Sequence, residues 1–567
     1  MPLCSQHHHK AVWATIAALF LTASIASANK LQPLVLITGV NKGNIGQGLA
    51  KASLNEPQFQ NFKVGITGRD LRKLNEVVAS LDASKRTVPL VLKDVSDKAA
   101  IQGLNKELEA MGLEARVIFA NAGYLGATGP FARHNLDESI ATINGHLDQV
   151  HWLDKYVLTP VDPESPNKRA PKTLVVTSSI IRESERGGEL RIPKYFVATI
   201  YAVAKAIQTR RFEVAAAENK YDVVAALGGG ATWTNLIRGM LASVGKWRTI
   251  YRGVKELPRG LEEIVGAFEP LVDAPESEVS RAVEAIAKQY EMPVSAIRQA
   301  FTQLVAEIDK MIEVRKKNLG GDFSTVDSVG AHGVNAALKR TPGHFENWDA
   351  MVDNSESPVL PGRLDRVRRP DFRGKQVVVT HHPSEQRRAE TIARILGETG
   401  ANVDLMEVLN ATEVVKFPKK TYGVVHVSGA SDATQPLKTM DDDVWQDRKH
   451  QHIFDPIAVA IGAMRAMNPA ALEDVREYTG QKGFLAFVGS DYGFNEAERA
   501  RRKQKTMWGT ASRVLPYALR NEFVEEFGSD MNFFGINGGM PVDQGNVLLY
   551  GIHPDLNKAY KIISILE

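Results

Sequence analysis

From Leu31 onward, short apolar runs alternate with segments whose apolar residues recur at every third or fourth position. The apolar runs, such as "PLVLITG" at 33–39 and "ARVIFANAG" at 115–123, predict buried strands. The segments between them, such as "LRKLNEVVASL" at 71–81, predict amphipathic helices. Strands that alternate with helices form a parallel sheet with helices on both faces. We therefore predict an α/β fold with a doubly wound, Rossmann-like sheet over residues 31–240.

The alternation stops near residue 241 and starts again at Gly374. Apolar runs such as "KQVVVTHH" at 375–382 then repeat the plan of the first half, which indicates a tandem duplication with a second Rossmann-like unit over residues 366–567. Residues 241–365 lie between the two units. They begin with a helical pattern and continue, from residue 323, with a Gly-, Pro- and Ser-punctuated stretch typical of a loop or linker.

Composition fits an ordinary globular protein. The 567 residues are 44% hydrophobic and 24% charged, and a net charge of +3 gives no reason to expect a nucleic-acid partner. The one cysteine, Cys4, excludes an intrachain disulfide and a cysteine-based zinc site.

Residues 1–30 form a segment of their own. An apolar run from Ala11 to about Ala28 ends in "ASIASA", which is similar to the cleavage site of a secretory signal peptide. A membrane anchor, an organelle-targeting leader and an upstream-extended start codon are the alternatives. No other apolar run is long enough to span a bilayer, so membrane association is expected only through this segment, if it is not cleaved.

A glycine-rich loop directly follows the first predicted strand and opens a helix. It reads "TGVNKGNIGQG", from Thr38 to Gly48. Glycines at this place let the backbone approach a pyrophosphate at the helix N-terminus. The second predicted strand ends in "TGRD", where the adenosine ribose of a dinucleotide would lie. Arg69 and the loop residue Lys42 favour a 2′-phosphate and hence NADP(H), whereas Asp70 keeps NAD(H) as the alternative.

A tyrosine and a lysine lie four residues apart in "TIYAVAKAIQTRR" at 199–211. In a helix, Tyr201 and Lys205 share one face, so the ammonium can lower the pKa of the phenol and make it a proton donor. A Tyr-x-x-x-Lys pair also arises by chance, so its meaning depends on what surrounds it.

These features together resemble the short-chain dehydrogenases/reductases over residues 31–240. "TGVNKGNIG" resembles the family's glycine motif with one extra residue, a spacing also similar to enoyl reductases and to fungal fatty-acid-synthase ketoreductases. "KDVSD", "NAG" and "GGGATWT" resemble three further motifs in the expected order. The residues that the loop and the resemblance assign to the cofactor are Thr38, Gly39, Asn41, Lys42, Gly43, Ile45, Gly46, Arg69, Asp70, Asp94, Val95, Asn121, Ala122, Gly123, Tyr201, Lys205 and Thr234.

The resemblance also implies a catalytic set. Asn144 in "TINGHL" is placed like the family's helix Asn, which holds a water in the proton relay, and Ser179 or its neighbour Ser178 like the catalytic Ser. Tyr201 would donate the proton, and Lys205 would lower the pKa of its phenol and bind the cofactor ribose. The step of 22 residues from Ser179 to Tyr201, which carries a charged insert, is longer than usual, and Gly229 replaces the usual Pro of the last motif.

The second half follows the same plan without these residues. His381, His382 and Pro383 replace the glycine loop, where their side chains would crowd a pyrophosphate and Pro383 has no N–H. His452 replaces the helix Asn, Ser490 is kept, and Trp508 and Ser512 replace the Tyr and Lys. The histidines of this half do not converge on one metal, so no metal site is expected. Because family members usually pair through two long helices, the second half is expected to act as a built-in partner for the first; a homo-oligomer stays open.

The sequence therefore predicts an NADP(H)-dependent oxidoreductase that reduces a carbonyl, with 3-oxoacyl compounds as one option. The alternatives are an enoyl reductase and a non-catalytic NADP(H)-binding scaffold or sensor. The helical insert is expected either to cap the substrate pocket or to act as a packing spacer. NADPH chemistry favours the cytoplasm or an organelle lumen and conflicts with secretion, so the localisation stays open.

Overall fold

The fold was derived from a computed structural model of the chain. It describes residues 31–81, 85–158, 170–179, 184–186, 189–191, 198–219, 221–228, 232–252, 262–268, 271–272, 274–319, 323–347, 372–429, 436–467, 483–489, 507–508, 514–515, 518–519, 531–537, 548–553 and 558–564. The leader at 1–30 and the linker residues 348–371 lie outside these ranges. None of the helices in the described ranges has the length and apolarity needed to cross a bilayer.

The first half forms a seven-stranded parallel sheet in the order β3-β2-β1-β4-β5-β8-β9. Its strands are β1 (Gln32–Ile37), β2 (Lys63–Gly68), β3 (Thr87–Val91), β4 (Leu113–Ala120), β5 (Thr173–Thr177), β8 (Val223–Gly228) and β9 (Phe345–Asn347). The chain order reverses between β1 and β4, which makes the carboxyl ends of these two strands the place where a doubly wound sheet binds its ligand.

Helices cover both faces of this sheet because its strands are apolar on both sides. Along β1, Val35 and Ile37 pack into one core cluster while Leu34 and Leu36 pack into another. The first cluster includes α2 (Ile45–Asn55), α3 (Leu71–Leu81) and α11 (Val326–Lys339). The second includes α4 (Lys98–Ala110), α5 (Leu136–Trp152) and α6 (Thr199–Glu218). Short helical turns are η1 (Pro57–Phe59), η2 (Phe131–Arg133) and η3 (Leu153–Val157).

Part of the range predicted as insert and linker belongs to the first sheet. The stretch from residue 323, which the sequence predicted as a loop, forms α11, and β9 adds a seventh strand beside β8. The glycines that resemble a loop signal allow α11 to lie against α2: a Cβ on Gly48 would come within 1.9 Å of the Val326 carbonyl oxygen. A Cβ on Gly330 would come within 2.2 Å of the Gly48 carbonyl oxygen, so the two backbones touch.

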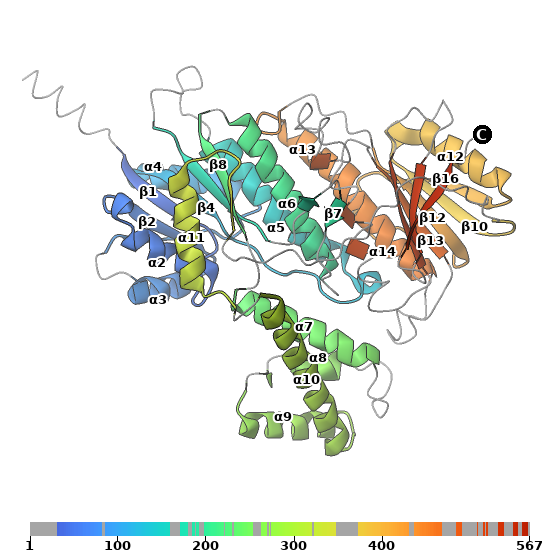
Figure 1. The fold of residues 1–567 in the computed structure, drawn as a ribbon, viewed down its shortest axis with the longest axis horizontal. Helices are drawn as coiled ribbons and strands as arrows, with labels where there is room; N and C mark the ends of the chain where they lie inside the picture. Colours follow the sequence, from blue (N-terminus) through green and yellow to red (C-terminus); the bar gives the residue numbers. More distant parts are fainter. Residues whose placement is uncertain are drawn as a thin grey trace, which may run out of the picture.

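The remaining insert is a helical arm that projects away from both sheets (Figure 1). It consists of α7 (Asn235–Arg252), α8 (Glu262–Phe268), α9 (Glu276–Gln289) and α10 (Val294–Leu319). Its two ends meet at the base, where Thr232 and Ser324 form a β-bridge and the rings of Trp233 and Phe323 lie 5.0 Å apart. The arm therefore leaves and re-enters the first half at the carboxyl end of β8.

The second half forms a sheet in the order β11-β10-β12-β13-β14-β15-β16. Its first five strands are parallel and the last two are antiparallel. The strands are β10 (Gln376–His381), β11 (Asn402–Glu407), β12 (Thr421–Val427), β13 (Gly483–Gly489), β14 (Met531–Asn537), β15 (Leu548–His553) and β16 (Lys558–Ser564). The helical segments are η6 (Pro383–Glu385), α12 (Gln386–Glu398), α13 (Asp442–Lys449), η7 (His450–Phe454) and α14 (Asp455–Met467).

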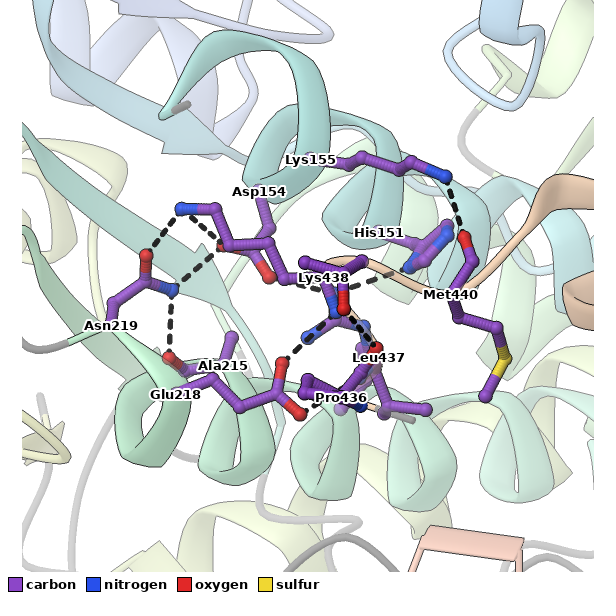
Figure 2. Close-up of polar contacts among 12 residues, drawn as sticks. His151, Asp154, Lys155, Ala215, Glu218, Asn219, Pro436, Leu437, Lys438 and Met440 are labelled. Atoms are coloured by element: carbon purple, nitrogen blue, oxygen red, sulfur yellow. Dashed lines mark hydrogen bonds and ion pairs between the residues drawn. The ribbon is translucent and has the colours of Figure 1, made fainter. Parts of the chain in front are cut away.

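The two halves pack through helices that lie between the two sheets (Figure 1). At one end of the contact Asn144 binds Lys449, and at the other end Lys155 binds Asp442. Residue numbers therefore rise along one helix as they fall along the other, so α5 and α13 are antiparallel. The contacts continue beyond the helices, as Figure 2 shows: the Glu218 carboxylate accepts hydrogen bonds from the backbone N–H groups of Leu437 and Lys438. This is the built-in pairing that the sequence predicted.

Candidate active site

The carboxyl ends of β1, β4 and β5 are joined by side-chain hydrogen bonds. The Thr38 hydroxyl accepts the backbone N–H groups of Asn121 and Ala122, at 2.9 and 3.0 Å. The Asn121 amide donates to the Thr38 carbonyl oxygen at 3.0 Å and accepts from the Thr177 hydroxyl at 3.3 Å. Three of the predicted cofactor residues therefore fix the sheet edge on which a ligand would rest.

The glycine loop after β1 has the backbone that a close ligand approach requires. Gly39 and Gly43 have positive φ angles of 68° and 74°, where a side chain would be strained. A Cβ on Gly39 would come within 2.5 Å of the Ala122 Cα, and one on Gly46 within 2.9 Å of the Asn121 amide nitrogen. The Asn44 side chain caps α2 by accepting from the Gln47 N–H, at 3.1 Å. The loop thus brings a helix N-terminus to the sheet edge, an arrangement suited to a pyrophosphate.

The charged residues at the end of β2 divide into two roles. One Asp70 carboxylate oxygen accepts the backbone N–H of Arg72 at 2.9 Å and lies 3.4 Å from that of Lys73. The hydrogen bond from the Lys73 N–H, though partly opposed by desolvation, lowers the pKa of Asp70. Asp70 thus acts as the N-cap of α3, while Arg69 and the loop residue Lys42 are exposed.

The other predicted cofactor residues surround the same edge. Asp94 follows β3 and accepts the backbone N–H of Ser96 at 2.8 Å, and the adjoining Val95 is half-buried. Thr234 is buried after β8, and its hydroxyl caps α7 at the base of the arm by accepting the N–H of Ile237, at 3.4 Å.

Tyr201 and Lys205 lie on one face of α6 and are both nearly buried. The Lys205 ammonium is 5.8 Å from the centre of the Tyr201 ring. It donates to the Thr177 carbonyl oxygen and to Gln208 Oε1, each at 3.0 Å. Because these acceptors carry no charge, burial lowers the pKa of Lys205 to about 7. The pair predicted from the sequence is therefore assembled beside the end of β5.

The two serines at the end of β5 differ in their surroundings. The Ser178 hydroxyl lies 2.6 Å from the Thr209 hydroxyl and is buried against α6. Ser179 is half-buried, one residue nearer the insert. Within the insert, β6 (Ser184–Arg186) and β7 (Glu189–Arg191) form a hairpin, while residues 180–183, 187–188 and 192–197 lie outside the described residues. Ser179 remains the candidate for the catalytic Ser.

The structure does not bring Asn144 to the Tyr201–Lys205 pair. Its carboxamide oxygen accepts a hydrogen bond from Lys449 of the second half, at 2.8 Å. Lys449 also forms a buried ion pair with Asp148, one turn further along α5, at 2.6 Å. The predicted relay residue thus lies on the face of α5 that packs against the second half.

Two residues that the sequence reasoning did not select lie on the opposite face of α5. His146 is buried with its ring centre 5.4 Å from that of Tyr201. Gln149 lies 2.5 Å from the Thr38 hydroxyl and donates to the Ala122 carbonyl oxygen at 2.8 Å. The signal for this face was the helical spacing of Thr142, His146 and Gln149 downstream of "NAG".

In the second half, the corresponding loop is filled by side chains. The His382 Nδ1 accepts the backbone N–H of Ser384 at 3.2 Å and caps η6. A Cβ on Gly429 would come within 2.9 Å of Gln451 Oε1 and 3.2 Å of His382 Nδ1, so these two side chains occupy the end of β12. Trp508 is fully buried, with its ring 5.3 Å from that of Trp445. Gly229, Ser490 and Ser512 lie outside the described residues.

Comparison with solved structures identifies the fold. The C-domain, with NADP, of a bacterial malonyl-CoA reductase has a TM-score of 0.60 and 16% identity over 91% of this chain and 92% of that one. This chain shares the fold of that C-domain. At that identity the likeness establishes the fold alone.

Two further solved structures match with lower TM-scores. Levodione reductase has a TM-score of 0.37 and 16% identity over 56% of this chain and 96% of its own. A 3-ketoacyl-ACP reductase from Sinorhizobium meliloti has a TM-score of 0.30 and 26% identity over 36% and 74%. These TM-scores are too low to add weight. No protein-family model and no curated protein matches the sequence.

Proposed function

We propose that the first half is an NADP(H)-dependent oxidoreductase that reduces a carbonyl to an alcohol. The observation that carries this proposal is the Tyr201–Lys205 pair, with the ammonium 5.8 Å from the phenol ring, at the sheet edge that also holds the glycine loop. A chance pair would have no reason to lie at the carboxyl ends of the strands, where a doubly wound sheet binds its ligand.

The residues present fit NADP(H). Gly39 and Gly46 pack so closely against Ala122 and Asn121 that a Cβ on either would clash, which keeps the loop backbone at the sheet edge, and Asp70 is already engaged as a helix cap. Arg69 at the end of β2 and Lys42 in the glycine loop are then the basic residues offered to a 2′-phosphate, which favours NADP(H) over NAD(H). When bound, the nicotinamide supplies the hydride.

The protein's own residues manage the proton. Tyr201 is the proton donor to the oxygen of the substrate carbonyl, with Ser179 as the group that orients this oxygen. Lys205, held by the Thr177 carbonyl and Gln208, keeps its ammonium beside the Tyr201 ring, where a positive charge favours release of the phenolic proton. Burial of the pair excludes water and strengthens this electrostatic effect.

For the substrate, we propose 3-oxoacyl compounds as the first class to test. The glycine-loop spacing resembles that of fatty-acid-synthase ketoreductases, and the structure with a similar fold comes from a malonyl-CoA reductase.

The test is oxidation of NADPH in the presence of a carbonyl panel that includes 3-oxoacyl thioesters, aldehydes and ketones, with enoyl thioesters as a separate arm. The proposal predicts turnover on a carbonyl. Turnover on enoyl thioesters alone supports an enoyl reductase instead, and NADPH binding without any turnover supports a sensor or scaffold.

A further inference from the structure

His146 is the polar residue on the face of α5 that lies toward Tyr201. Asn144 is turned toward Lys449, whereas His146 reaches the Tyr201 ring from the other face of the helix. Its backbone carbonyl accepts from the Gln208 amide at 3.1 Å, and Gln208 in turn accepts from Lys205. His146 is thus connected to both members of the proposed catalytic pair.

The hydrogen bonds of the ring fix its tautomer. Nε2 lies 3.0 Å from the Tyr124 carbonyl oxygen, which can only accept, so Nε2 carries the proton. Burial, reinforced by the charge of Lys205, keeps the pKa of His146 well below 6.5, so the ring is neutral. Nδ1 is therefore a lone-pair acceptor.

That acceptor is buried and has no partner. A buried acceptor without a hydrogen bond is unfavourable and is found where a ligand or a water completes it. The carboxyl end of β4 lies next to it: a Cβ on the exposed Gly123 would come within 2.5 Å of the ring carbon Cε1 and 3.0 Å of Nδ1. Gly123, which has no side chain, therefore lies directly against the Nδ1 side of the ring at the carboxyl end of β4.

We propose that Nδ1 of His146 accepts a hydrogen bond from a hydroxyl group bound at the Tyr201–Lys205 site. The inference rests on the proposed function, and the hydroxyl belongs either to the nicotinamide ribose or to the alcohol formed from the substrate. His146 then supplies the α5 group that the resemblance assigned to Asn144.

Two substitutions separate the two nitrogens. The amide of His146→Asn overlies Nδ1 and keeps an acceptor there, but it loses the hydrogen bond to Tyr124. The amide of His146→Gln reaches the Nε2 position and keeps that hydrogen bond, but it leaves Nδ1 unreplaced. We expect His146→Gln to weaken binding or turnover about tenfold, the size expected for one hydrogen bond, and His146→Asn to lose clearly less than His146→Gln.

The measurements identify the source of the hydroxyl. A weaker dissociation constant for NADPH, measured by fluorescence titration, assigns it to the ribose; a raised KM for the alcohol in the reverse reaction, with NADPH affinity unchanged, assigns it to the alcohol. The opposite order of the two variants, or equal losses in both, overturns the inference and assigns His146 to packing.

A measurement on the unaltered protein avoids any folding defect. The ¹⁵N resonance of His146 Nδ1 should move when NADPH or the product alcohol is added, and an unchanged resonance with both contradicts the inference. If the wild-type protein neither binds NADPH nor turns over a carbonyl, the proposed function fails first, which distinguishes the two outcomes.

Discussion

Helix α5 of the first half corresponds to α13 and η7 of the second half. These helices pack against each other, but they direct different side chains toward the edges of their sheets. In the first half, α5 has one face toward the second half, through Asp148, and another toward Tyr201, through His146. In the second half, α13 supplies Lys449 and Trp445 to the same contact, but the neighbouring η7 directs Gln451 into the place where a ligand would lie. Packing between the halves thus persists where chemistry does not.

The loops after the first strands differ in the same sense. The loop after β1 has two glycines with positive φ, whereas the loop after β10 begins with His382 and Pro383, whose side chains fill it. The first loop leaves residues 41–43 exposed, whereas side chains of the second half occupy the corresponding place.

The largest expected effect is the difference in turnover between substitution of Tyr201 and substitution of its counterpart Trp508. Tyr201→Phe keeps the ring but removes the proton donor, so NADPH-dependent turnover should fall by about 10²–10⁴-fold. Trp508→Phe alters only the buried aromatic cluster near Trp445. Because it removes no reacting group, the folded variant should keep a turnover within about threefold of wild type. Steady-state kinetics with both variants check this; equal losses would remove the distinction between the halves.

The second prediction concerns the ion pair that joins the halves. Lys449→Met leaves the buried Asp148 carboxylate without its cation and should destabilise the protein by about 3–5 kcal/mol in urea unfolding. The matched control is Lys155→Met, whose partner Asp442 is more exposed and keeps Lys98; its cost should be about 1 kcal/mol or less. A Lys449 variant as stable as the control would show that this contact does not hold the halves together.

The third prediction uses the buried ammonium of the first half. Burial lowers the pKa of Lys205 to about 7 in the folded protein, whereas the unfolded chain keeps a value near 10.5. The unfolded state therefore binds more protons between these values, so stability rises with pH in this window. From pH 7 to 9 the gain in wild type relative to Lys205→Met should be about 2 kcal/mol by urea unfolding. If the free energies of unfolding of the two proteins changed with pH in parallel, Lys205 would not be desolvated in the folded protein.

The smallest effect tests the helix contact that the sequence concealed. Gly48→Ala inserts a methyl group against the Val326 carbonyl and should cost about 1–3 kcal/mol. Gly103→Ala in α4 meets nothing within 4 Å and should stabilise the protein slightly, because alanine favours the helix. Thermal unfolding of both variants measures the difference. An unchanged melting temperature for Gly48→Ala would contradict the close packing of α11 against α2.

The sequence predicted the parts of this molecule that depend on local pattern. The glycine loop and the Tyr201–Lys205 pair are read from neighbouring residues, and the structure brings them to one sheet edge. Asn144 was placed by motif position, but it lies two residues from His146. A shift of two residues turns a helix by about 200°, to the opposite face.

The helix α11 and strand β9 were missed for a different reason. In the sequence alone, the glycines of α11 resemble loop residues. Their role is apparent only from the contact with Gly48, which lies almost three hundred positions earlier in the chain. Strand β9 has only three residues, too few for a periodic signal. Both elements depend on contacts distant in the sequence, which local pattern does not contain.

We propose that the first half binds the nucleotide while the second half supports it. Calorimetric titration of the full-length protein with NADPH measures this division. We expect one binding site per chain and its loss in Gly39→Ala, where the added methyl group meets the Ala122 backbone. Two sites per chain, no site, or a single site that survives Gly39→Ala would contradict it.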